Sequence, residues 1–328
     1  MASLSVDGTP VTGAFWASLI ELSITDHAGD EADEIQTHLH DDPFFAIPRR
    51  GAVLKAALGY RETGLIDKGT YTADEIELEC LPYSMHIRGR AADMREDLKT
   101  DRERHWDNKS LKEIVEEVAG AHGLKAQVAE SLGAIRLPWL GQQDESDLNL
   151  LHRLARRYGG LFAVKDGNLV IAERGKGEST SGAALAPLVI TRNMIVRGSC
   201  RVRFSDRERH KKVVAYTDDK GRQHRKEVEV ESDAGAAAIL RIPTPFGTED
   251  EAKRAAKAKS KELEDGAATL SFTIEGNPSV IAGAPLRLAG VRPGVDEIDW
   301  TIETATDRFR KDRYITEIEA KRAAPAEG

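Results

Sequence analysis

Cysteine and aromatic residues are scarce in this chain, and long apolar runs are missing. Only Cys80 and Cys200 occur among 328 residues, and aromatic residues make up 5%. Two cysteines provide neither a disulfide framework nor a zinc-ribbon spacing, so we expect both to be buried as small hydrophobic side chains. Without 18 consecutive apolar residues, no transmembrane helix and no stable membrane insertion are expected. The start, MASLSVDGTPV, is unlike a signal peptide, which predicts synthesis and assembly in a cytoplasm.

Motifs of the common enzyme classes are also missing. There is no Gly-rich phosphate loop, no G-x-S-x-G elbow and no H-E-x-x-H helix. Glu145 and Asp147 are two positions apart at a predicted helix start, so their side chains should diverge rather than form a catalytic pair. We therefore predict that the protein is not an enzyme and has no catalytic or cofactor-binding residues.

Positive charge is in the minority, because 55 acidic residues oppose 47 lysines and arginines and give a net charge of −8. Tight binding to nucleic acid needs a basic face. The most basic stretch, CRVRFSDRERHKKVV at 200–214, has no aromatic platform beyond Phe204. We interpret it as a solvated strand and turn, and expect no sequence-specific binding to nucleic acid.

Histidine is concentrated in TDHAGDEADEIQTHLHDDP, at 25–43, where His27, His38 and His40 occur among seven acids. On a β-strand the H-x-H spacing places His38 and His40 on one face. Imidazole and carboxylate together suit zinc, iron or manganese, so a metallohydrolase is one hypothesis. A third ligand at a motif spacing is missing, and we predict that these histidines bind no metal.

Hydrophobic periodicity divides the chain into three parts of an α+β protein. Residues 1–95 contain β-rich runs such as GTYTADEIELECL. Residues 96–182 contain two helices and a β-hairpin at Asp166-Gly167. Residues 183–328 are again β-rich, with one Ala/Lys/Glu helix after Thr248 that we expect to be solvated.

The middle part has the clearest local signals. Ser110 and Glu113 form a predicted capping box, and a helix should follow until Gly123. The apolar positions of this helix and of a second one recur at helical spacing: Leu111, Ile114, Val115 and Val118, then Leu148, Leu151, Leu154, Ala155 and Tyr158. His122 and His152 should pack or cap rather than bind metal. We interpret the charged stretch at 97–108 as a loop and the Gly/Ser/Ala-rich stretch at 174–187 as a linker.

A weak internal repeat links the two β-rich parts. GAVLKAALGY at 51–60 resembles GAPLRLAGVR at 283–292, and each run precedes an aromatic-led strand, from Tyr71 and from Trp300. The repeat predicts that residues near 51–80 and 283–310 are equivalent strands of two copies of one domain. Direct pairing between these segments, or unrelated folds, would contradict it.

Taken in order, these motifs resemble the phage late control D family, the baseplate hub proteins of contractile tails, which are similar to the N-terminal part of VgrG spike proteins. The resemblance rests on ADEIQTHLHDD, P-x-x-G-x-x-L at 48–54, KGTYTADEIEL, MHIRGRAADM, QQDESDLNLLHRLARRYGGLFAVKDGNLVIAERGKG, IEGNPSVIAGAPLRLAG and YITEIEA. It covers nearly the whole chain.

The resemblance implies two tube-like antiparallel β-barrel domains, at 1–95 and 183–328, with the small α/β module at 96–182 inserted between them. It implies a homotrimeric ring in the virion's tail baseplate that joins the hexameric tail tube to a trimeric spike. Tail tube protein, a separate spike protein and a tape-measure protein are the implied partners. The histidine-rich segment then becomes a solvated strand face, and an acidic channel wall would not grip DNA.

Two alternative functions are less favoured by the sequence. A VgrG-like secretion or tailocin spike complex would have an OB-fold and a repetitive β-helix after the hub region, and this chain has neither pattern. A metallohydrolase, or a hub fused to a cell-wall hydrolase, would need a domain-length segment that the motifs leave unassigned, and none remains.

Overall fold

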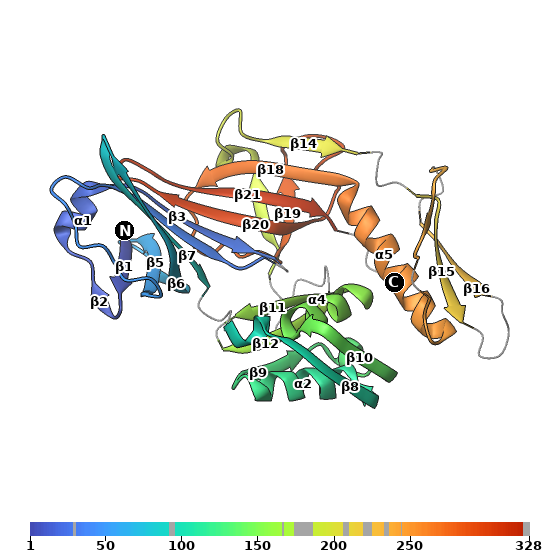
Figure 1. Cartoon of the computed structure of the whole chain (residues 1–328). Coiled ribbons are helices and arrows are strands. Elements are labelled where there is room, and N and C mark those ends of the chain that lie inside the picture. Colours follow the sequence, from blue (N-terminus) through green and yellow to red (C-terminus); the bar gives the residue numbers. More distant parts are fainter. Residues whose placement is uncertain are drawn as a thin grey trace.

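A single large β-sheet contains strands from both ends of the chain (Figure 1). The computed structural model describes residues 1–28, 31–91, 96–165, 167–173, 186–205, 210–218, 225–232, 236–243 and 245–323. Figure 1 shows the blue N-terminal strand β3 lying beside the red C-terminal strand β20, with the green middle part of the chain below the sheet in this view.

The large sheet has 13 strands in two sets. The N-terminal set contains β1 (Ala2–Val6), β2 (Thr9–Pro10), β3 (Leu19–His27), β4 (Glu34–His40), β5 (Val53–Tyr60), β6 (Gly64–Cys80) and β7 (Tyr83–Ala91), with helix α1 (Gly13–Ser18). The C-terminal set contains β13 (Leu188–Thr191), β14 (Arg201–Phe204), β18 (Ala268–Glu275), β19 (Pro285–Ala289), β20 (Trp300–Phe309) and β21 (Tyr314–Arg322), with the 3₁₀ turn η2 (Arg192–Met194).

The expectation of two separate barrels is wrong, because the described strands form no closed barrel. Their order is β14-β18-β21-β20-β3-β4-β7-β6-β5-β1-β2, and off this path β19 pairs with β20 and β13 pairs with β19. Strand β20 pairs antiparallel with β3 of the other set instead of with a strand that would close its own set. The result is one open sheet that continues from one half of the chain into the other.

The two predicted repeat segments nevertheless have the same pattern of backbone hydrogen bonds. The Gly51 amide donates to the Ala73 carbonyl at 2.7 Å, and the Gly283 amide donates to the Ile302 carbonyl at 2.8 Å. The amides of Ala73 and Ile302 each return a bond to the residue that follows the glycine, at 2.9 and 3.0 Å. Both glycines have positive φ, 76° and 85°, a conformation that residues with a Cβ adopt poorly.

The correspondence extends to a bulge and its ion pair. The β6–β7 register shifts at Asp74, and the β20–β21 register shifts at Glu303. Each bulged carboxylate meets a cation of the neighbouring strand: Arg90 Nε lies 3.5 Å from Asp74, and Lys321 pairs with Glu303. By these registers β5, β6, β7, β4 and β3 correspond to β19, β20, β21, β18 and β14. The two repeat segments lie in one sheet but do not pair with each other.

Strict alternation gives the sheet one buried face and one polar face. In β4 the side chains of Ile35, Thr37 and Leu39 are buried, whereas those between them are exposed or half-buried. Strand β18 alternates in the same way. Successive strand side chains point to opposite faces, so the buried residues of each half form their own hydrophobic cluster on the same side of the sheet.

The middle part forms a compact module with a separate core. Its elements are η1 (Glu96–Lys99), β8 (Asp101–Ser110), α2 (Leu111–Ala121), β9 (Lys125–Val128), α3 (Glu130–Gly133), β10 (Arg136–Ser146), α4 (Asp147–Arg157), β11 (Gly160–Lys165) and β12 (Asn168–Glu173). The capping box is confirmed, with Ser110 Oγ accepting from the Glu113 amide. Strands β11 and β12 form the predicted hairpin, although Asp166 lies outside the described residues.

Two expectations from the sequence are wrong, and a third falls mostly outside the described residues. Residues 101–108 of the predicted loop belong to strand β8, which pairs along β10. Cys80 is exposed at the end of β6 and Cys200 is half-buried, so neither is a fully buried core residue. Of the predicted linker at 174–187, residues 174–185 lie outside the described part of the chain.

The second β-rich part contains a further small unit. Strands β15 (Lys212–Asp218), β16 (Arg225–Glu231) and β17 (Ile239–Arg241) form a sheet against helix α5 (Glu249–Gly266). Thr248 caps α5 as predicted, accepting from the Glu251 amide. The helix is not solvated on all sides, because Ala252, Ala255 and Ala256 are buried against the strands.

Candidate assembly surface on the large sheet

The histidine-rich segment lies on the polar face of the sheet. His38 in β4 pairs across the strands with His86 in β7, and the two rings stack with centroids 3.8 Å apart. Burial lowers the pKa of His38, and the nearby His86 lowers it further. His40 is exposed on the same side of β4. Within the described ranges, no three His, Cys, Asp or Glu side chains form a group that could hold a metal ion.

This polar face continues across both halves of the sheet. Paired residues share a face, and their registers place the following charged side chains together on it: Glu21, Glu34, Glu75, Glu77, Glu79, Arg88, Arg90, Arg201, Arg203, Arg308, Glu317, Glu319 and Lys321. Cross-strand ion pairs connect several of them, including Arg88 with Glu75 at 3.2 Å and Arg90 with Glu34 at 3.5 Å. The face therefore carries acidic and basic side chains in nearly equal number.

The two halves meet on this face where β20 pairs with β3. The hydroxyls of Thr25 and Thr306 lie 3.3 Å apart across the junction. Arg308 and Arg310 both donate to the Glu21 carboxylate, at 2.8 and 2.6 Å. Burial alone raises the pKa of Glu21, but these two guanidinium groups hold it below its usual value. Side chains as well as backbone bonds thus connect the halves.

A buried ion pair connects the halves on the opposite face. Lys68, from the β5–β6 hairpin, places Nζ 2.7 Å from the Asp307 carboxylate in β20, and both side chains are at least 90% buried. Tyr314 and Thr316 donate to the same carboxylate at 2.9 and 2.6 Å. A buried charge is stable only when it is paired and hydrogen-bonded, so this network favours one fixed arrangement of the two halves.

A second buried network lies inside the module and was missed from the sequence. Asp147 is fully buried at the start of α4. His122 Nε2 lies 2.8 Å from its carboxylate, Gln142 donates at 2.9 Å, Arg104 also donates, and Arg102 lies 3.4 Å away. Burial alone raises the pKa of Asp147, but hydrogen bonds from its partners hold it below the ordinary 3.8.

Asp147 and Glu145 diverge as predicted. Glu145 binds Arg153 at the surface, 2.7 Å from Nη2, whereas Asp147 points into the module. His122 is buried at the end of α2, as expected for a packed histidine, and its ring contacts the Asp147 carboxylate. Each predicted member of the carboxylate pair therefore has its own structural partner.

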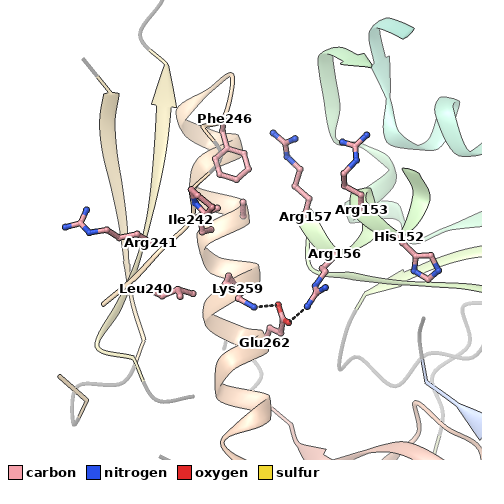
Figure 2. A pocket seen from close by; sticks show the side chains of 12 residues that line it. His152, Arg153, Arg156, Arg157, Leu240, Arg241, Ile242, Phe246, Lys259 and Glu262 are labelled. Carbon is pink, nitrogen blue, oxygen red and sulfur yellow. Dashed lines mark hydrogen bonds and ion pairs between the residues drawn. The ribbon is translucent and has the colours of Figure 1, made fainter. Parts of the chain in front are cut away.

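A cavity of about 760 Å³ lies between α4 and α5 (Figure 2). Arg153, Arg156 and Arg157 of α4 are among the residues that line it (Figure 2). Arg156 and Lys259 both pair with Glu262, at 3.0 and 2.9 Å, and Arg157 lies over the Phe246 ring and pairs with Glu251 at 2.7 Å. Since their charges are compensated within the chain, these side chains connect the module to α5 rather than form an open anion site.

No described helix is long and apolar enough to cross a membrane.

The chain is similar to known phage tail proteins. The model of the family described as phage tail baseplate hub (GPD) matches residues 52–312. Over 353 aligned residues the chain is 31% identical to the probable baseplate hub protein of Escherichia phage P2, and the alignment covers 96% of this chain and 91% of that protein.

Solved structures share the fold. The 43 kDa tail protein of prophage MuSo2 from Shewanella oneidensis superimposes with a TM-score of 0.76 at 18% identity, covering 97% of each chain. The E. coli c3393 protein is a type VI secretion component described as similar to the T4 tail proteins gp27 and gp5. It superimposes with a TM-score of 0.59 at 13% identity, covering 99% of this chain and 77% of that chain.

Proposed function

The chain belongs to the phage tail baseplate hub family, and from its role as a structural hub of the virion tail we propose that three copies form a ring between the tail tube and the spike. The observation that carries this proposal is the duplicated strand register. Three chains, each with two corresponding five-strand sets, present six similar strand sets to a six-fold tube and remain three-fold toward the spike. Such a ring closes through heterologous contacts, in which different surfaces of neighbouring copies meet.

The polar face of the large sheet is our candidate for the channel wall. The opposite face is covered by the hydrophobic clusters of the two halves, so only the polar face is suited to a water-filled channel. Arg88 and Arg308, which would otherwise attract phosphate, pair with Glu75 and with Glu21 and Glu317. A wall of paired charges lets DNA pass without holding it.

The remaining assignments follow from this arrangement. We assign the halves of the ring to residues 1–95 and 183–328, and the module at 96–182 to the periphery, in agreement with its separate core. The partners are a tail tube protein, a spike protein and a tape-measure protein, assembled in the host cytoplasm, and no enzymatic activity is assigned. The match to the phage P2 protein extends over nearly the whole chain and favours a phage tail over a VgrG-like secretion spike.

The test is deletion of the gene from the phage or prophage that carries it. Cells should then produce heads without complete tails, and a plasmid copy should restore infectious particles. Electron cryomicroscopy of the restored tails should find three chains in the baseplate ring. Complete tails without the gene, or a ring of six chains, would contradict the proposal.

A further inference from the structure

The pairing of the two halves inside the chain identifies two strand edges, on β6 and β14, that could pair with a second copy. Inside the chain, β20 pairs with β3. By the repeat, β20 corresponds to β6 and β3 corresponds to β14. Among the described residues, the outer edge of β6 from Glu75 to Cys80 has no partner strand, because β5 pairs only as far as Thr72. Strand β14 pairs with β18 alone.

The internal register can be transferred to these two edges. In the repeat Thr304 corresponds to Glu75, and Ile24 corresponds to Val202. Within the chain Thr304 is paired with His27, and the register continues without a shift along β20 and β3. The equivalent register therefore sets β6 antiparallel to β14, with Leu78 directly opposite Val202.

The two edges are complementary in this register. On the polar face, Glu77 lies opposite Arg203 and Glu79 opposite Arg201, and all four side chains are exposed. On the other face, Leu78 meets Val202, and Ile76 meets Phe204. Leu78 is 43% exposed and Phe204 is 64% exposed in the single chain. Opposite charges and apolar pairs directly across two strands stabilise a sheet.

We propose that residues 75–80 of one copy pair with β14 of the next copy, so that the large sheet continues around the whole ring. This inference rests on the proposed function, because it specifies the contact that closes the three-chain ring. Pairing between like edges is disfavoured, since β6 against β6 would oppose glutamates and β14 against β14 would oppose arginines. The contact is therefore heterologous, as a closed ring requires.

The only two cysteines of the chain provide the test. Two residues beyond the Leu78–Val202 pair, the same antiparallel register places Cys80 directly opposite Cys200, at the end of the contact. Directly opposite Cβ atoms lie about 4.5–5.5 Å apart, within the reach of a short bis-maleimide. Each side chain points to the apolar side of its strand, because Cys80 alternates with Glu79 and Cys200 packs beside the core of its half.

The experiment uses tails purified from cells in which the chromosomal gene carries Cys80→Ser, Cys200→Ser or neither change. Treatment with the bis-maleimide should convert the wild-type hub into a covalent three-chain species and leave each single variant uncrosslinked. Co-expression of the two variants should produce a two-chain species and nothing larger, because each chain then has one thiol. That product can form only between copies.

Charge reversal gives a second readout on the same contact. Glu77→Arg should reduce the yield of complete tails, and Arg203→Glu combined with it should restore the yield. Lack of crosslinking in tails that contain a three-chain ring would overturn this inference and leave the proposed function intact. Tails without a three-chain ring would overturn both.

Discussion

The buried carboxylate of Asp147 provides the sharpest prediction about the module. Asp147→Asn removes the negative charge that faces Arg104 and Arg102, whose side chains are 23% and 33% exposed. Removal of one partner from a buried ion pair costs about 3–5 kcal/mol. We expect Asp147→Asn to lower the free energy of unfolding by about 3 kcal/mol, at the low end of this range, because both guanidinium groups keep some access to water. Glu145→Gln is the matched control, and its pair with the half-exposed Arg153 should be worth about 0–1 kcal/mol.

Hydrogen exchange of the α4 amides in the full-length protein measures this difference locally. Exchange should accelerate roughly a hundredfold in Asp147→Asn, since every 1.4 kcal/mol corresponds to about a factor of ten. The control should change it by a few-fold at most. Equal acceleration in the two variants would show that the buried network contributes no more than the surface pair, and our reasoning would then be wrong.

The difference in stability between wild type and Asp147→Asn should depend on pH. The pKa of Asp147 is lower in the folded protein than its ordinary 3.8. The carboxylate therefore stabilises the fold fully above that value, and its contribution is lost as the pH falls through the folded pKa. The stability gap between wild type and Asp147→Asn should be constant from neutral pH to about pH 5 and should narrow below about pH 4. A gap that persists unchanged in acid would mean that the carboxylate is not the stabilising charge.

Three further predictions concern packing, protonation and metal. Leu151→Ala, at a fully buried position, should cost about 2–5 kcal/mol in urea denaturation, clearly more than the same change at the partly buried Leu148. An NMR titration should place the pKa of His38 below its usual 6.5, and His86→Gln should raise it. Elemental analysis after dialysis should find no stoichiometric zinc, iron or manganese, and one bound metal that disappears in a His38→Ala/His40→Ala variant would contradict this.

Local chemistry explains why the helices of the module could be predicted. Ser110 and Glu113 satisfy each other's backbone donors at the start of α2, and this depends only on residues three positions apart. The apolar stripe of α4 was also visible, although Leu150 is buried too and was missed. The repeat was detectable because Gly51 and Gly283 occupy equivalent positions of positive φ, where few other residues substitute.

Long-range pairing explains what could not be predicted. The β8 stretch has the composition of a charged loop, and it forms a strand because it pairs with β10, which lies later in the chain. One of its charges, Arg104, is neutralised by Asp147, 43 positions later. The two barrels were expected from the family resemblance, because the strand patterns of each β-rich part do not specify which strands pair. Strand β20 instead pairs with β3, and Thr306 contacts Thr25 across 281 positions. Local patterning carries no information on which edge pairs with which.

The β20–β3 junction inside the chain and the proposed β6–β14 contact between copies differ in chemistry, and the difference suits the different conditions in which each forms. The junction inside the chain forms once, during folding, and is reinforced by the buried pair of Lys68 and Asp307. The edges proposed to meet between copies must stay soluble until assembly, and exposed strand edges otherwise invite wrong pairing. Glutamates along one edge and arginines along the other repel their own kind and attract each other. A free hub is thereby protected from self-pairing by the same charges that select the correct neighbour in the ring.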